Sequence, residues 1–153
     1  MSNQGQFSSS EVLTAASLNG FSQVTILNTL QTVSSGTNTS ISFSDADEMI
    51  DVGNWHNSTQ PTRITPSVTG IYLFTAQCLS INNSNGRALI NLFLNTDVIA
   101  SEDDNDGGHD LSLAVHYPVD SAGDYISLQC FHNAGVAKEA RFILSAQLIR
   151  QTS

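Results

Sequence analysis

The chain has 153 residues, of which 40% are hydrophobic and 12% charged, and its formal net charge is -9. This length allows one domain with a sizeable core and is short for two. Five Lys and Arg against fourteen Asp and Glu disfavour binding to nucleic acid or to an anionic membrane, because affinity for phosphates depends on clustered cations. Uncharged polar residues fill most turns and surface positions, which is typical of all-β proteins.

Residues 1–22 are predicted to form an N-terminal arm and anchor, and residues 23–153 a folded head. The first ten residues are small and polar and show no periodicity. After them, Ser10 is placed to cap a short helical turn that Asn19 and Gly20 would close. A helix this short is marginal alone, so we expect it to become ordered by docking onto another surface.

The clearest strand lies in the middle of the chain, after a loop bracketed by Pro66 and Gly70. One face of this strand is fully apolar and is predicted to lie in the core; it consists of Tyr72, Phe74, Ala76 and Cys78. The first half of the other face is also apolar, with Ile71 and Leu73. A strand with two apolar faces needs a cover on its outer side, either another sheet or a neighbouring subunit.

Alternation of apolar residues predicts further strands on both sides of this one. The strand over residues 24–33 places Val24, Ile26 and Leu30 on one side. The other predicted strands are 39–43 with Ile41 and Phe43 inward, 87–95, 98–100, 111–117, 125–132, and 141–149 with Phe142, Leu144, Ala146 and Leu148 inward. About eight to ten short strands with turns every 8 to 12 residues indicate an all-β sandwich or jelly roll.

Residues 44–60 are predicted to form a long polar connection, and connections of this length are often functional. Trp55 and His56 within it are candidate receptor contacts, because an aromatic ring beside polar residues suits sugar or protein binding. The alternative is that Trp55 packs over the end of the sandwich as a lid, and the usual burial of Trp favours this alternative.

The densest charge in the chain is the segment 101–110, which is predicted to be an acidic loop. Its residues Glu102, Asp104 and Asp106, followed by Gly107, partly match a calcium-binding loop. The twelfth position of that motif is Leu113 instead of the required bidentate Glu. We therefore prefer a solvated loop and keep the three carboxylates as weak metal candidates.

No catalytic or cofactor-binding arrangement is evident. The four histidines lie in separate segments without metal-ligand spacing, although a threefold axis would bring three copies of one of them together. No strand–turn–helix elbow strains a serine, so we expect neither an enzyme nor a cofactor.

Cys78 and Cys130 lie in apolar strands and are expected to be free, buried thiols. The opening sequence MSNQGQFSSSEV has no basic segment followed by an apolar run, and nothing later approaches the ~18 apolar residues of a membrane span. We expect the protein to be made and kept in a cytosol-like compartment until it is assembled into something larger.

Several segments together resemble the jelly-roll globular heads of complement and tumour necrosis factor-like proteins. These segments are ITPSVTGIYLFTAQ, NGRALINLFLN and SAGDYISLQCFHNAG. Gly70 and Tyr72 match the Gly-x-Tyr pair that opens the central strand of those heads, and Ala122-Gly123-Asp124 matches a turn. The resemblance spans residues 24–150 and implies a homotrimer. Candidates for the trimer seam are Ile71, Leu73, Tyr125, Phe131 and Phe142, and alternation alone leaves open which of them face the threefold axis.

The opening segment FSSSEVLTAASLNGF resembles the start of tail-fibre and other structural proteins of tailed bacteriophages. The matching positions, which form the predicted anchor, are Glu11, Val12, Leu13, Thr14, Ala15, Leu18 and Asn19. The segments TSISFSDAD and NWHNSTQPTRIT likewise resemble the jelly-roll heads of phage virion proteins.

This second resemblance implies a virion protein that is assembled in the host cytoplasm. In the favoured interpretation, the arm holds a trimeric knob on another structural protein of the capsid or tail. The alternative is the receptor-binding head of a short tail fibre, which would recognise a host-surface glycan or protein. We favour the knob because the chain has an anchor and a head but no shaft.

Overall fold

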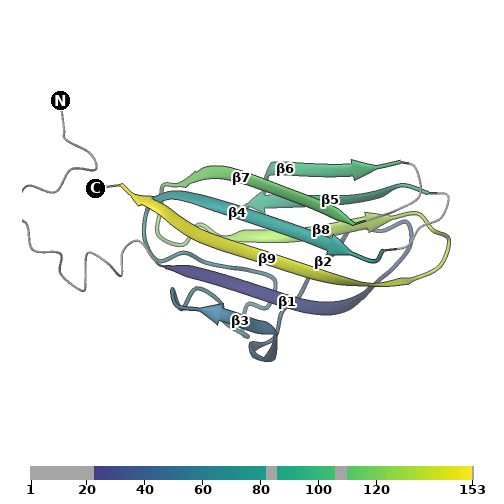
Figure 1. Cartoon of the computed structure of the whole chain (residues 1–153), viewed down its shortest axis with the longest axis horizontal. Coiled ribbons are helices and arrows are strands. Elements are labelled where there is room, and N and C mark those ends of the chain that lie inside the picture. The colour runs from purple at the N-terminus through teal and green to yellow at the C-terminus, as the bar shows by residue number, and fades with distance from the viewer. Residues whose placement is uncertain (1–22, 82–85, 106–109, 153) are drawn as a thin grey trace, which may run out of the picture.

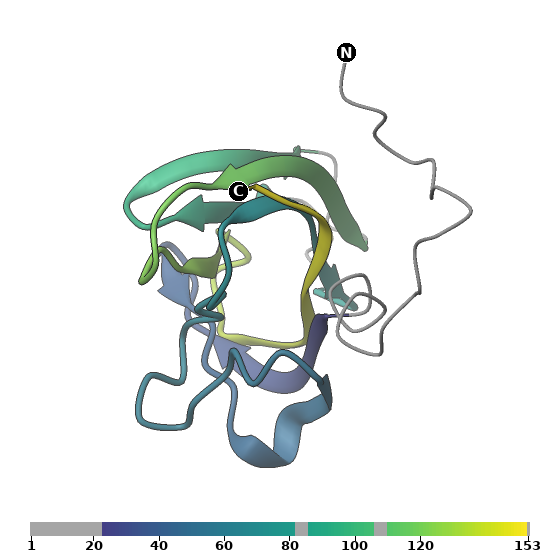
Figure 2. The same cartoon turned by 90° about the vertical axis from the view of Figure 1, so that its left-hand side faces the viewer.

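The computed structural model describes residues 23–81, 86–105 and 110–152, in which nine strands form two antiparallel sheets. The five-stranded sheet has the order β3-β1-β9-β4-β7 and the four-stranded sheet the order β2-β8-β5-β6. The two sheets lie face to face (Figure 1), and the view from the end shows them enclosing the interior between them (Figure 2). This arrangement is the all-β jelly-roll sandwich that the sequence predicts.

The elements follow one another with short connections, apart from the segment before β4. They are β1 (Val24–Val33), β2 (Thr39–Ser40), the 3₁₀ helix η1 (Asp45–Asp47), β3 (Glu48–Asp51), β4 (Gly70–Leu79), β5 (Ala88–Leu94), β6 (Asp97–Asp104), β7 (Leu111–Val119), β8 (Ile126–His132) and β9 (Lys138–Gln151). No helix in these three described ranges is long and apolar enough to cross a membrane.

The core lies between the inner faces of the two sheets. On β4 the predicted alternation is confirmed, since Tyr72, Phe74, Ala76 and Cys78 are fully buried. The facing strands β5 and β8 contribute Ile90, Leu92 and Leu128, and β9 contributes Phe142. Strand β4 is paired on both sides, between β9 and β7, and its inner face is covered by the other sheet, which explains why its sequence alternates so cleanly.

On β1, the three residues that the sequence placed on one side, Val24, Ile26 and Leu30, do share a side, and it is the outer one. The structure buries Thr25, Leu27 and Thr29, whereas Leu30 is 55% exposed and Ile26 only partly buried. The inner face contains Thr25 and Thr29, so it shows no continuous apolar pattern in the sequence. Thr25 is tolerated there because its hydroxyl donates a hydrogen bond to the Asp51 carboxylate.

The connection predicted over residues 44–60 contains two elements that the sequence pattern did not show. Residues 45–47 form η1, and Glu48–Asp51 form β3, a short edge strand that pairs with β1. Met49 and Ile50 within it are 63% and 41% exposed, so no apolar face marks this strand. Of the predicted strand over 39–43, only Thr39–Ser40 is a strand, although Ile41 and Phe43 are buried as expected.

The first part of the predicted acidic loop is also a strand. Strand β6 extends to Asp104 and pairs with β5, with Glu102 opposite Ile90. Asp103 forms an ion pair with Arg87 at 2.8 Å. The hydrogen bond between them lowers the pKa of Asp103 and raises the pKa of Arg87. Pairing with β5 extends β6 although its end is rich in acidic residues, which favour turns in isolation.

Candidate functional site

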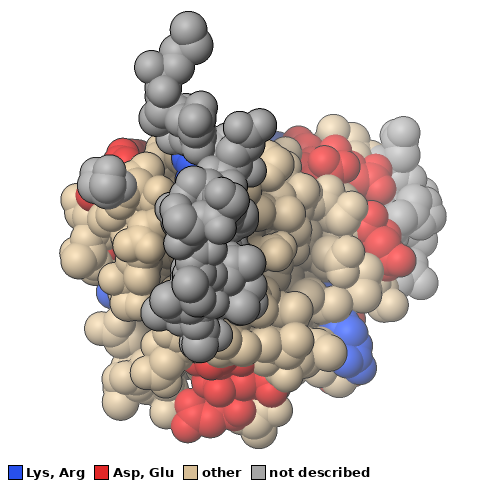
Figure 3. Space-filling view, turned by 60° about the vertical axis from the view of Figure 1, so that its left-hand side comes forward, with Lys and Arg blue, Asp and Glu red and all other residues tan. Residues whose placement is uncertain are grey.

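A hollow of about 500 Å³ opens beside η1 and β3 and is the main candidate site. It is lined by Asp45, Glu48, Asp51, Asn54, Trp55, His56, Asn57, Ser58, Gln60, Arg63 and Thr65. In Figure 3 an acidic patch occupies the lower edge of the molecule, the level at which β3 lies in Figure 1. Most of the lining side chains offer oxygen or nitrogen atoms, so the hollow suits a polar or charged ligand.

Asp51, the last residue of β3, fixes the loop that forms one wall of this hollow. Its Oδ1 accepts hydrogen bonds from the Thr25 hydroxyl and from the Trp55 backbone N–H, the latter at 2.9 Å. Its Oδ2 accepts the His56 backbone N–H at 3.2 Å. One carboxylate therefore ties β1 to the loop after β3 and sets the positions of Trp55 and His56.

Trp55 is only 3% exposed, so it is not the exposed residue considered from the sequence, although it lines the hollow. Its ring meets the Tyr72 ring edge-on, with centroids 5.4 Å apart, and its Nε1 donates a hydrogen bond to the Ser67 hydroxyl at 3.2 Å. The burial supports the other interpretation, in which Trp55 packs as a lid against the aromatic residues of β4.

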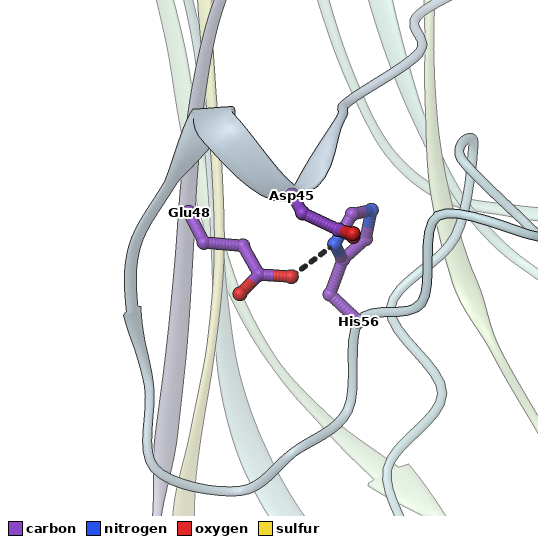
Figure 4. A group of neighbouring side chains, drawn as sticks. All are labelled: Asp45, Glu48 and His56. Atoms are coloured by element: carbon purple, nitrogen blue, oxygen red, sulfur yellow. Dashed lines mark hydrogen bonds and ion pairs between the residues drawn. The ribbon is translucent and has the colours of Figure 1, made fainter.

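His56 lines the hollow, and the side chains of Glu48 and Asp45 lie beside its ring (Figure 4). Its Nδ1 is 2.6 Å from Oε1 of Glu48. A carboxylate oxygen of Asp45, one of Glu48 and a ring nitrogen of His56 all lie within 4.8 Å of one another. The His56 side chain is fully buried, and its Nε2 has no hydrogen-bond partner among the described residues.

A second hollow, of about 330 Å³, adjoins the first through Arg63, which lines both. The Arg63 guanidinium lies over the Tyr125 ring, 3.7 Å from its centroid. Other residues lining this hollow include Asn95, Ser127 and Gln129. Tyr125 is therefore part of a pocket wall in the single chain.

The five seam candidates do not share one surface. Ile71 and Leu73 lie on the outer face of the five-stranded sheet, because they alternate with the buried residues of β4. Phe131 lies on the outer face of the four-stranded sheet, on the opposite side of the sandwich. Phe142 is fully buried between the sheets, so its prediction as a seam residue is wrong, whereas its predicted inward orientation is confirmed.

The outer face of the five-stranded sheet has an uncharged centre, which we call the uncharged face. It consists of three rows across β1, β9, β4 and β7: Val24, Gln147, Leu73 and His116; Ile26, Ser145, Thr75 and Ala114; and Asn28, Ile143, Gln77 and Ser112. None of these residues is Lys, Arg, Asp or Glu, in a chain with nineteen of them. The Thr75 and Ser145 hydroxyls satisfy each other at 2.6 Å in the middle of it.

The remaining predicted sites are only partly described. Glu102 is exposed on β6 and Asp104 ends that strand, while Asp106 lies outside the described residues. The anchor residues 11–19 also lie outside them. Cys78 and Cys130 are free and buried, and a hydrogen bond with Cys130, together with burial, raises the pKa of the Cys78 thiol.

Neither a protein-family model nor a curated protein sequence matches the chain. Solved structures do match it. The globular domain of the zebrafish complement 1qA protein is 17% identical, with 85% of this chain and 99% of that chain covered and a TM-score of 0.66. Murine APRIL, solved at pH 8.5, is 15% identical, with 82% and 100% covered and a TM-score of 0.57.

A third match is the PRD1 vertex protein P5, which is 16% identical, with 81% of this chain and 96% of that chain covered and a TM-score of 0.55. Identities this low establish a shared fold and leave the function of this chain open. The fold is a jelly roll of the tumour necrosis factor-like and complement globular-head type.

Sequence reasoning missed Asp45, Glu48, Asp51 and Arg63 as site residues. Asp45 and Glu48 are three residues apart, a spacing that places both on one side of a helical turn, but no pattern predicted η1. Asp51 meets Thr25, and Arg63 meets Tyr125, across long sequence separations. Such contacts are set by the fold and leave no local signal.

Proposed function

We propose that the chain is a structural protein of a bacteriophage virion, a trimeric surface knob attached through its N-terminal arm. The uncharged face carries the trimer part of this proposal. The virion part is supported by the shared fold with the vertex protein P5 of phage PRD1 and by the resemblance of residues 11–19 to the opening of tailed-phage structural proteins.

The uncharged face suits close packing against identical faces. Val24, Ile26 and Leu73 are large apolar side chains that one chain leaves partly exposed. Full burial of such a side chain contributes roughly 1–2 kcal/mol, and no charge in these rows would have to be stripped of water. The polar groups at the centre do not resist burial either, because Thr75 and Ser145 already bond to each other.

One pair of variants tests the trimer. Thr75→Arg places a charge at the centre of the uncharged face, and Asn91→Arg places one at the matching position of β5, between Ser101 and Gln129 on the outer face of the other sheet. Light scattering of the purified chain should give a trimer mass for the wild type and for Asn91→Arg, and a single-chain mass for Thr75→Arg. A monomeric wild type, or equal loss in both variants, would reject the trimer.

A second experiment tests the attachment. Virions purified from infected cells should contain the chain, and virions made with a version lacking residues 1–22 should not, because the arm is proposed to hold the knob. The truncated chain should instead remain in the soluble fraction with the mass of a trimer. Detection of the truncated chain on virions in normal amounts would contradict the proposed anchor.

The hollow beside η1 supports a second candidate function, the recognition of a host-surface glycan or protein. Its wall carries Asn57, Ser58 and Gln60, which offer the hydrogen-bond donors and acceptors that sugars require. Arg63→Ala should then reduce virion adsorption to host cells without changing the amount of chain on the virion. Lys138→Ala, which removes a positive charge at the start of β9, is the matched control and should leave adsorption unchanged.

A further inference from the structure

The cluster of Asp45, Glu48 and His56 combines three potential metal ligands from three consecutive parts of the fold (Figure 4). Asp45 belongs to η1, Glu48 begins β3, and His56 lies in the loop that follows β3. Their donor atoms lie within 4.8 Å of one another. We propose that this cluster binds a divalent transition-metal ion of the zinc type, through the His56 ring and the two carboxylates.

The state of the His56 ring distinguishes this cluster from an ordinary acidic surface patch. A fully buried imidazole normally has partners for both nitrogens, because an unpaired buried polar atom is costly. Here Nδ1 has Glu48, whereas Nε2 has no hydrogen-bond partner in the described part of the chain. The ring is therefore incompletely satisfied, and Nδ1 is the nitrogen that faces Glu48, so an ion in this cluster would bind Nδ1 in place of its hydrogen bond to Glu48.

The donor set selects the class of ion. A neutral imidazole nitrogen with two carboxylates suits Zn²⁺, which accepts His, Asp and Glu ligands together. Ca²⁺ and Mg²⁺ require shells of oxygen atoms, so the His56 nitrogen disfavours both. With three protein ligands, the ion would keep a coordination position toward the hollow, where a water molecule or an oxygen of a ligand can bind.

The backbone around the cluster is fixed by other residues, so the ligands are positioned in advance. Asp47 is occupied in capping η1, since its Oδ2 accepts hydrogen bonds from the Ser44 backbone N–H and hydroxyl at 2.7 and 2.8 Å. Asp51 holds the His56 backbone N–H, and His56 also forms a β-bridge with Ile64. These contacts fix the backbone around the cluster without using the Asp45 carboxylate, while the Glu48 carboxylate and the His56 ring bond to each other.

Isothermal titration of the full chain, first stripped of metal with EDTA, tests the proposal with Zn²⁺ as the probe. The wild type should bind about one zinc ion per chain, and Asp45→Asn and His56→Gln should each weaken binding by at least about 10-fold. Asp45 is exposed, so Asp45→Asn should fold normally and decides the result if His56→Gln does not fold. Equal concentrations of Ca²⁺ should not displace the zinc.

The control combines Glu102→Gln with His109→Ala, which removes one of the five carboxylates and the histidine of the segment 101–110. This double variant should bind zinc as the wild type does. The proposal is overturned if the wild type shows no saturable zinc binding, if the control loses as much affinity as Asp45→Asn, or if Ca²⁺ competes equally. None of these outcomes depends on the virion role, so failure of one proposal leaves the other unaffected.

Discussion

The interior of the sandwich and the segment from η1 to Thr65 are stabilised in different ways. The interior consists of many apolar contacts, in which Tyr72 stacks on Phe74 with ring centroids 5.5 Å apart. The segment exposes most of its apolar side chains and is held largely by hydrogen bonds, among them those from its backbone to Asp51 and the pairing of β3 with β1. Changes in the interior should therefore affect the whole fold, whereas changes in the segment should affect the candidate site.

Truncation of an interior aromatic residue should have the largest effect. Phe74→Ala removes a fully buried ring from the middle of β4 and should lower the free energy of unfolding by roughly 3–5 kcal/mol, measured by chemical denaturation. Phe93→Ala is the matched control, because this ring lies on the outer face of β5 and is only partly buried. Equal losses in the two variants would show that burial between the sheets does not dominate stability.

The interior was also the region that the sequence predicted best. Strict alternation along β4 placed four core residues correctly, since a strand covered on one face by the opposite sheet must repeat apolar residues with period two. On β1 alternation grouped Val24, Ile26 and Leu30 correctly but did not show that they face outward, because the inner face holds Thr25 and Thr29, and the hydrogen bond of Thr25 to Asp51 leaves no local signal. Pattern thus predicts apolar burial and misses burial that is made possible by a distant hydrogen-bond partner.

A rise in pH to alkaline values should weaken the interior. Burial raises the pKa of Tyr72 from its ordinary value of 10.0 to about 12. A hydrogen bond with Cys130, together with burial, also raises the pKa of the Cys78 thiol above its ordinary value of 9.0. Both groups ionise more readily in the unfolded chain, so their contribution to stability is complete below about pH 9 and declines as the pH rises.

For Tyr72 alone, the loss between pH 10 and about 12 should be roughly 2 kcal/mol. Denaturation curves across this range measure it, and Tyr72→Phe is the control because it removes the titrating hydroxyl and keeps the ring. This variant should be less stable near neutral pH, since the hydroxyl donates a hydrogen bond to the Val68 carbonyl at 2.7 Å. A wild type and a Tyr72→Phe variant that lose equal stability would contradict the assignment.

In the segment, Asp51→Ala should have the largest effect. It removes the acceptor of the Trp55 and His56 backbone N–H groups and of the Thr25 hydroxyl, at a cost of roughly 2–4 kcal/mol. Hydrogen exchange should show faster exchange at residues 55 and 56 with little change on β4. Thr25→Val removes one of the three bonds and should cost roughly 1 kcal/mol, without freeing the loop. If hydrogen exchange were equally accelerated along β4, Asp51 would instead stabilise the whole fold and not only the loop.

The candidate site was poorly predicted because, like the contacts of Asp51, it depends on side chains that only the folded chain brings together. The sequence pointed to Trp55 and His56 because an aromatic residue in a polar connection is unusual, and both do line the hollow. It assigned Trp55 to the surface as one alternative, and nothing in the spacing showed that Glu48 would meet His56 eight residues later. The meeting depends on β3 pairing with β1, which only the folded sheet specifies.

Gly53→Ala should have the smallest effect and tests whether Trp55 links the two regions. A Cβ at residue 53 would lie 2.3 Å from the Trp55 ring, so the indole must move away from Tyr72 and Ser67 at a cost of roughly 1–3 kcal/mol. Trp55 is the single tryptophan of the chain, and its fluorescence emission should shift to longer wavelength as the ring meets water. Ser67→Ala removes the hydrogen bond without adding volume, so it should shift the emission less. If Gly53→Ala left emission and stability unchanged, packing of Trp55 on Tyr72 would not couple the segment to the interior.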